Sequence, residues 1–459
     1  MKIRLIIYSV LIIVLPFKGY SQEQVILTLD QSVDFALQKN PDFKTAEKEL
    51  RIAGAGVLEA YSNILPKLNA TMNYQRQWEI QSTRVKNFFK EALPGLPGNE
   101  NAPDYLEVSF GIPHSLVYGA TVTQPIFLGG AGIAGIKMAY AAKDAAAQSL
   151  ESKKQNLIFQ TANAFYSCLL ADELVAVQEE ALKQAQANLD VVLKKYDVGS
   201  ASGFDKMRAE VEVANIKPQV IAAKNNLESA YTNFRMIIGM DPGTKVDISG
   251  ELEYKPDEYG EMNLTELQEL ASKNRPERQI VDAQKRISKN GVSVAVGNFL
   301  PKILFQTDLS YLGQSDKLNF RFNEDFSKGF TSAISVQVPI FQGFKSISQY
   351  QQAKLNYKIS QDREKQVDDG IAAGVEFAYN KFNEANEKYL SAQQTVDLAQ
   401  EALRLANLMY EEGANTQLDV LVSQLALTEA KLNYFSSLFD YQIARYQLRV
   451  VTGQLTGVL

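Results

Sequence analysis

Two stretches decide the fold: Val122-Thr-Gln-Pro-Ile-Phe-Leu-Gly129 and Val336-Gln-Val-Pro-Ile-Phe-Gln-Gly343. They share a Pro-Ile-Phe core and a closing glycine, and they lie 214 residues apart. The same spacing separates Tyr196-Asp-Val-Gly199 from Tyr410-Glu-Glu-Gly413. Because chance matches do not share one spacing over such distances, we interpret the chain as an internal duplication.

A second spacing marks the start of each repeat. The Leu-Pro-Lys motifs at Pro66 and Pro301 lie 235 residues apart, so the first repeat has 21 extra residues between Pro66 and Pro125. We place these residues in a long external loop at about residues 79–113. The predicted domains are residues 22–239 and 264–459 as the two repeats, with 240–263 as a linker.

The sequence of each repeat predicts an opening helix, a long helix and a return helix. The long helices, Ala131–Tyr196 and Lys345–Tyr410, lack proline and run for 66 residues each, far beyond the ~20 residues of ordinary helices. Alanines recur every seven residues opposite larger side chains, which is typical of a coiled-coil seam. Cys168 falls on a larger-residue position, so we interpret it as a packing residue. The opening helices are predicted at Leu29–Asn63 and Leu264–Asn298, and the return helices at Gly203–Ile238, bent or interrupted at Pro218, and Gln417–Val451.

Two segments with period-two alternation follow each opening helix. In the second repeat they run from Ile303 to Tyr311 and from Phe330 to Val338, and in the first from Leu68 to Tyr74 and from Leu116 to Val122. Transmembrane β-strands need ~9–11 residues with one apolar and one polar face, although soluble hairpins alternate in the same way. Four strands cannot close a barrel. If they lie in a membrane, three chains would supply twelve strands.

Composition narrows the function. The formal net charge of −6 argues against nucleic acid as a partner. With one cysteine and one histidine, His114, which we place in a loop, the chain offers no internal disulfide and little basis for a metal site or a catalytic triad. Lys2, Arg4 and the apolar stretch Leu5–Phe17 are typical of a secretory signal peptide, predicted at residues 1–21. An uncleaved membrane anchor is the alternative.

These residues resemble the outer membrane efflux protein family, the TolC-like exit ducts. The matching features are Ala36-Leu37-Gln38-Lys39-Asn40-Pro41, the two Leu-Pro helix ends, the two Pro-Ile-Phe turns and the two Tyr-to-Gly turns. The order of these features, found twice, carries the resemblance. It implies a mostly α-helical α/β membrane protein, in which a trimeric 12-stranded outer-membrane β-barrel, four strands per subunit, continues into a periplasmic α-helical coiled-coil barrel.

The resemblance also implies function and partners. It implies a passive exit duct of a tripartite efflux pump or type I secretion system, located in outer-membrane lipid and joined to a periplasmic adaptor protein and an inner-membrane transporter. It implies no catalysis and no cofactor. In the family a Tyr-to-Asp contact and inward aspartates close the periplasmic tip, and the helical turns meet the adaptor. The matching gate residues are Asp419, Asp205, Tyr410 and Tyr196, and the matching adaptor-contact residues are Gly199, Ser200, Gly413 and Ala414.

The match at the tip is incomplete. A second aspartate of the family falls at Val422 here, and a latching arginine falls at Asn415, so a double acidic ring and an arginine latch lack their residues. Three copies of Asp419 around an axis would raise each other's pKa. Capping of the following helix is the alternative role for Asp205 and Asp419. A stand-alone porin and a periplasmic coiled-coil scaffold are the alternative functions. An enzyme has the least support.

Overall fold

The computed structural model describes residues 25–92, 95, 97, 101–109, 111–321 and 325–455. The signal peptide predicted at residues 1–21 lies outside these residues. The chain divides into two compact units. The sheet unit comprises residues 48–149 and 277–367, and the helical unit comprises residues up to 47, 150–276 and from 368 onward. The repeat boundaries at residues 239 and 264 stay a prediction.

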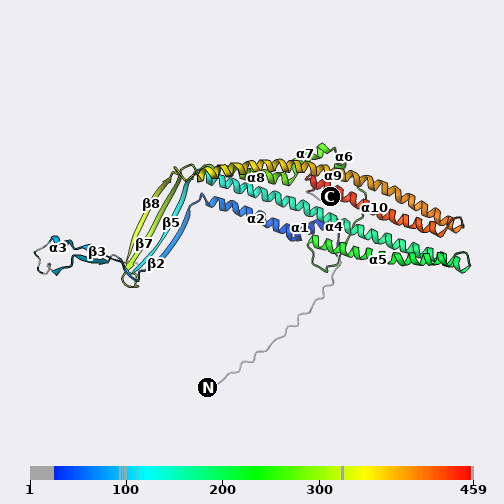
Figure 1. The fold of residues 1–459 in the computed structure, drawn as a ribbon, viewed down its shortest axis with the longest axis horizontal. Coiled ribbons are helices and arrows are strands. Elements are labelled where there is room, and N and C mark those ends of the chain that lie inside the picture. The colour runs from blue at the N-terminus through cyan, green and yellow to red at the C-terminus, as the bar shows by residue number, and fades with distance from the viewer. Residues whose placement is uncertain are drawn as a thin grey trace, which may run out of the picture. The chain divides into compact units, whose positions relative to one another are not determined.

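The sheet unit contains a four-stranded antiparallel sheet in the order β2-β5-β7-β8 (Figure 1). The prediction of two hairpins is confirmed, since β2 pairs with β5 and β7 with β8. The central contact between β5 and β7 joins the two repeats. The strands are β2 (Lys67–Arg76), β5 (His114–Leu128), β7 (Lys302–Ser315) and β8 (Phe326–Gln337).

The two hairpins share one register. Lys67 lies opposite Thr123 in the first, and Lys302 lies opposite Gln337 in the second. Each β2 residue is 235 positions from its β7 counterpart, and each β5 residue is 214 positions from its β8 counterpart. The duplication therefore holds residue by residue in the sheet.

The external segment differs from the predicted loop. It contains a third antiparallel hairpin, of β3 (Ser82–Lys86) and β4 (Tyr105–Ser109), with the short helix α3 (Phe88–Ala92) after β3. Cross-strand charges such as Arg84 and Glu107 pair along this hairpin. The placement of His114 in a loop was also wrong, because it begins β5, is buried, and its Nδ1 lies 2.7 Å from the Tyr74 hydroxyl.

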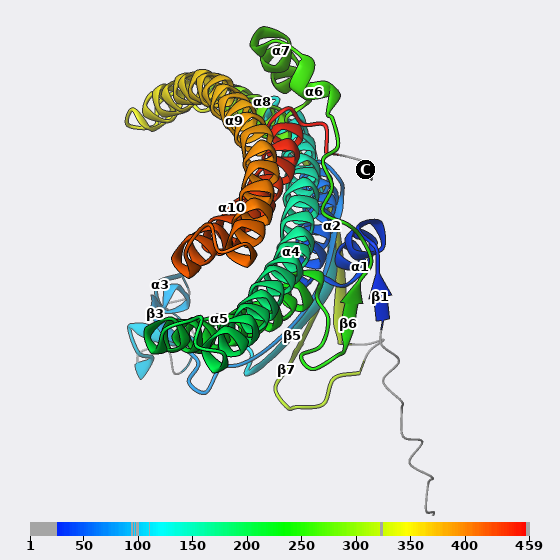
Figure 2. The same cartoon turned by 90° about the vertical axis from the view of Figure 1, so that its right-hand side faces the viewer.

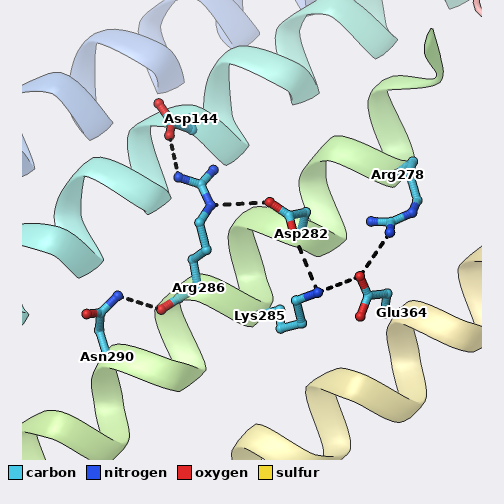
Figure 3. A network of polar contacts seen from close by, with 7 residues as sticks. All are labelled: Asp144, Arg278, Asp282, Lys285, Arg286, Asn290 and Glu364. Atoms are coloured by element: carbon cyan, nitrogen blue, oxygen red, sulfur yellow. Dashed lines mark hydrogen bonds and ion pairs between the residues drawn. The ribbon is translucent and has the colours of Figure 1, made fainter. Parts of the chain in front are cut away.

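Helix α8 (Pro276–Gly297) holds the helical part of the sheet unit together through ion pairs (Figure 3). Arg286 reaches Asp144 of α4 at 2.9 Å. On α9, Glu364 accepts from Arg278 at 2.9 Å and from Lys285 at 2.6 Å. These contacts place α8 between α4 and α9. Of the long helices, residues 131–149 of α4 (Ala131–Asp197) and 345–367 of α9 (Lys345–Glu411) belong to this unit.

The opening helix predicted in each repeat is two helices. In the first repeat α1 (Leu29–Lys39) ends before α2 (Pro41–Ser62). Asn40 separates them because it precedes proline, which disfavours helical backbone, and because its Oδ1 accepts the amides of Asp42 and Phe43, starting α2. The second repeat has the same break, between α7 (Leu264–Asn274) and α8.

In the helical unit, α4 runs between the return helices α5 (Gly203–Ile238) and α10 (Gln417–Val451), and α10 lies beside α9 (Figure 1). Lys224 of α5 binds Glu179, and Lys431 of α10 binds the neighbouring Glu180. Helix α5 continues through Pro218, so the predicted interruption was wrong. Its missing amide donor costs only one hydrogen bond in a helix of 36 residues.

Two apolar cores of the helical unit lie against α1 and α4. One joins α1, α4 and α5, and it contains Cys168 with no exposed surface. The packing role predicted for Cys168 is confirmed, and burial raises the pKa of its thiol to about 12. The other core joins α1, α4 and α10 around Tyr166 and Tyr446.

The linker between the repeats has structure of its own. Its strand β6 (Val246–Ile248) pairs in parallel with β1 (Val25–Leu27), beside α1 (Figure 2). Further on, the buried carboxylate of Asp257, just before α6 (Glu258–Glu261), meets Arg445 at 3.1 Å and Arg449 at 2.9 Å. This charge cluster fastens the linker to α10.

Within the part of the chain that the structure describes, no helix has the length and apolar character needed to cross a membrane.

Candidate functional site

The candidate gate consists of the turn from α4 to α5 and the turn from α9 to α10. Gly199 and Gly413 have φ angles of 76° and 77°, a left-handed conformation that side chains disfavour. The amides of Ser200 and Ala414 donate to Lys195 and Met409 carbonyls, each at 2.7 Å, which ends the long helices. The four predicted adaptor-contact residues therefore lie in two matching turns.

Both predicted gate aspartates cap the return helices. The Asp205 carboxylate accepts from the Ser202 amide at 3.1 Å and from its hydroxyl at 2.7 Å. The Asp419 carboxylate likewise accepts from the Thr416 amide at 2.9 Å and from its hydroxyl at 2.6 Å. These hydrogen bonds hold the pKa of each aspartate below its ordinary value. Capping is confirmed. Within one chain the pKa of Asp419 is lowered, whereas repulsion among three copies would raise it.

Tyr410 is held by a lysine that sequence reasoning missed. Lys195 donates to the Tyr410 carbonyl at 2.8 Å, and its Nζ lies 3.9 Å from the centre of the tyrosine ring. Burial, and then the nearby charge of Asp205, raise the pKa of the Tyr410 hydroxyl. Among the described residues no hydrogen bond joins Tyr410 to Asp205. A sequence signal existed, because the duplication places Met409 at the position of Lys195.

Tyr196 has a looser environment than its counterpart Tyr410. Its side chain is 42% exposed, and the Nζ of Lys206 lies 5.2 Å from its ring centre. A cavity of about 270 Å³ lies beside Tyr410 between α4, α9 and α10. Tyr410 therefore lines a cavity near the end of α9.

The two turns differ in charge. The first is flanked by four cations, with Asp197 and Asp205 among them, and the second is flanked by three carboxylates and none of the corresponding cations. Opposite charges on neighbouring turns attract, and the attraction weakens with salt. The cations are Lys194, Lys195, Lys206 and Arg208, and the carboxylates are Glu411, Glu412 and Asp419.

A second feature bears on function: the sheet has two outer edges. Within the described chain β2 and β8 each pair on one side only, and every residue of β2 is exposed. Unpaired strand edges bind other strands readily. The Pro-Ile-Phe segment after β8 is also uncovered, with Ile340 94% and Phe341 74% exposed.

In the helical unit the two return helices differ in how much of their surface is buried. Helix α10 buries residues along its length, whereas α5 buries Val213, Val220 and a few others. Among the exposed side chains of α5 are Met207 and Ile221. One face of α5 thus lacks the cover that the duplicated helix α10 has.

Among the described residues no group of three or more histidine, cysteine, aspartate or glutamate side chains could hold a metal ion.

Comparison with known proteins assigns the class. The outer membrane efflux protein family model matches residues 33–240 and 267–454. The chain belongs to this family.

Individual relatives agree with this assignment. Outer membrane protein TolC of Salmonella enteritidis is 22% identical, over 97% of this chain and 86% of its own. The alkaline protease secretion protein AprF of Pseudomonas aeruginosa is 20% identical, over 92% and 83%. The Campylobacter jejuni CmeC outer membrane channel has the same fold, with a TM-score of 0.76 at 18% identity over 93% of this chain and 85% of its own.

TolC is an outer membrane protein, AprF is a secretion protein and CmeC is an outer membrane channel. The chain is accordingly an outer-membrane exit duct whose helical part lies in the periplasm.

Proposed function

We propose that three copies of this chain close a 12-stranded barrel in outer-membrane lipid and continue it as a helical tunnel through the periplasm. Solutes or proteins pass through it passively, without cofactor or catalysis, and a periplasmic adaptor and an inner-membrane transporter complete the machine. The observation that carries the proposal is the pair of open edges at β2 and β8. Lipid supplies no partners for strand edges, so edges in a membrane require closure.

The proposed gate is the turn region of the helical unit. Asp419, Asp205, Tyr410 and Tyr196 surround it, and Lys195 ties the end of α4 to the end of α9. Gly199, Ser200, Gly413 and Ala414 are proposed to contact the adaptor. In support, their turns are exposed, and the Lys195 contact is one that a docking partner could compete with.

Conductance tests the proposed function. Wild-type protein in planar lipid bilayers should behave as a trimer that is mostly closed, because its turns hold the tip together. A continuously open channel would favour the stand-alone porin. Protein that high salt strips from membranes would favour the periplasmic scaffold.

The variant Asp419→Asn tests the acidic gate separately from helix capping. Asparagine keeps an oxygen that accepts the Thr416 hydrogen bond but removes the charge. We expect the divalent cation concentration that half-blocks the channel to rise several-fold. Glu401→Gln is the control, since it removes an exposed α9 carboxylate paired with Arg404. Unchanged block in Asp419→Asn would contradict an acidic ring.

A further inference from the structure

The duplication supplies a template for the contact that β2 and β8 lack. In the sheet β7 is the counterpart of β2, and β5 is the counterpart of β8, as the matching hairpin registers establish. The pairing of β5 with β7 is therefore a contact between one repeat and the next. If the repeats continue around a closed wall, β8 meets β2 of the next copy in the same manner.

We infer that β8 of one copy pairs antiparallel with β2 of a second copy, with Ser335 opposite Asn73 and Ile334 opposite Tyr74. This register follows from the observed pairs Thr121 with Asp308 and Ala120 with Leu309, when β5 numbers are raised by 214 and β7 numbers lowered by 235. The inference rests on the assembly proposed above and adds the residue-level interface.

The chemistry of the mapped pairs supports this register. Thr121 donates to the Asp308 carboxylate at 2.7 Å across the β5–β7 contact. In the inferred register Ser335 and Asn73 take the places of Thr121 and Asp308. The Ser335 hydroxyl can donate a hydrogen bond to the side-chain oxygen of Asn73 in the same way. On the other face Ile334 meets Tyr74, and both are exposed in the single chain, at 67% and 45%. A shift by one residue would set polar against apolar side chains.

The repeated Pro-Ile-Phe motif acts as an internal control. In the first repeat residues 126–128 belong to β5, and Phe127 lies opposite Ile303 of β7, after a bulge at Pro125. In the second repeat the same motif lies beyond the end of β8, and Phe341 has no strand opposite it among the described residues. The two motifs of one chain therefore differ in whether a partner strand lies opposite them. The mapping sets Phe341 opposite Leu68 of the second copy, which would extend β8.

Paired cysteines test the register. Within one chain β2 and β8 lie at opposite edges of the sheet, about 14 Å apart at ~4.8 Å per strand, so a disulfide between them must join two copies. Three double variants probe the predicted contacts: Ser335→Cys with Asn73→Cys, Ile334→Cys with Tyr74→Cys, and Phe341→Cys with Leu68→Cys. Pair geometry alternates along an antiparallel ladder, so one of the first two suits a disulfide.

The matched controls shift the register by two residues and keep the same face. They are Ser335→Cys with Thr71→Cys and Ser335→Cys with Gln75→Cys. Wild-type protein, whose Cys168 is buried, is the background control. After mild oxidation in membranes we expect covalent trimers on non-reducing gels, with at least about tenfold more from a predicted pair than from a shifted pair, since disulfides tolerate little displacement.

The outcomes separate the register from the assembly. Highest yield from a shifted pair overturns the register. No disulfide from any predicted pair, in protein that lysine cross-linking shows to be trimeric and that conducts ions, overturns the predicted residue pairs while the trimeric channel stands. A chain that stays monomeric and forms no channel overturns both.

Discussion

The two repeats have matching backbones but fasten the linker by different chemistry. On α10 Arg445 pairs with the buried Asp257 at 3.1 Å, and Arg449 joins it. The equivalent positions on α5 hold Tyr231, whose hydroxyl donates to Asp247 at 2.9 Å, and Arg235, which binds Glu228 instead. A buried ion cluster therefore holds the linker to α10, whereas a tyrosine hydroxyl holds it to α5.

Replacing Asp257 should have the largest effect. Asp257→Asn leaves Arg445 and Arg449 without their anion, in a site where the carboxylate is 1% exposed. We expect a loss of about 3–5 kcal/mol in the free energy of unfolding. Asp247→Asn, the same change at the linker aspartate that binds α5, keeps an oxygen that accepts the Tyr231 hydrogen bond and should cost about 1 kcal/mol. Denaturant unfolding followed by circular dichroism measures both, and equal losses would contradict the comparison.

Overpacking the alanine seam should have the next largest effect, and it should be equal in the two repeats. Ala385 is 1% exposed and its counterpart Ala171 is 9% exposed, so leucine at either site should cost about 1–3 kcal/mol. Ala392 lies seven residues further along, beside a cavity of about 390 Å³ between α9 and α10. Ala392→Leu should therefore cost less, measured as trimer melting temperature in detergent. A larger loss at Ala392 than at Ala385 would show that this space is filled in the assembly.

The ion pairs of α8 give a smaller and pH-dependent effect. Glu364 has a lowered pKa, because Lys285 and then Arg278 stabilise its charge, and leucine occupies its counterpart position 150. A lowered carboxyl pKa contributes stability above the ordinary glutamate value near ~4.3, and the contribution is lost as pH falls through the lowered value. Glu364→Gln should cost about 1 kcal/mol at neutral pH. Unfolding followed from neutral pH into acid should show the difference shrinking once the pH falls below the ordinary glutamate pKa. A difference that persists in acid would point to packing instead.

The smallest effect on stability is expected at the gate. Lys195→Met copies the second repeat into the first and removes the contact with Tyr410, worth about 0.5–1 kcal/mol. The channel should open several-fold more often in bilayer recordings, with conductance per opening unchanged. The reciprocal Met409→Lys is the control, because it adds a cation without removing the Lys195 contact. Opening frequency equal to wild type in Lys195→Met would exclude this lysine as a latch.

The repeated motifs predicted the architecture well, because strand alternation and uninterrupted helical spacing can be seen directly in the order of the residues. The hairpins, the long helices and the packing of Cys168 followed from periodicity alone. The break at Asn40 was missed because it depends on one capping amide that interrupts no apolar period. The β3–β4 hairpin was missed because exposed strands paired by surface charges, such as Arg84 with Glu107, read as polar loop.

The gate was predicted less completely than the fold. The resemblance located the turns, and the structure assigned capping to Asp205 and Asp419. The role of Lys195 was not predicted, because its contact with Tyr410 joins residues 215 positions apart in the chain. The difference between Lys195 and Met409 marked the position, but without the fold nothing indicated that Tyr410 lay beneath the ammonium group.

The burial of Cys168 has a practical consequence. It is the only cysteine of the chain, it has no exposed surface, and the pKa of its thiol is raised to about 12. A maleimide reagent can react only after the core of α1, α4 and α5 opens, since the reactive thiolate needs both water and access. The rate at which Cys168 is labelled thus reports how often this core opens. Its labelling rate would distinguish opening of the tip, which leaves this core closed, from loss of the fold.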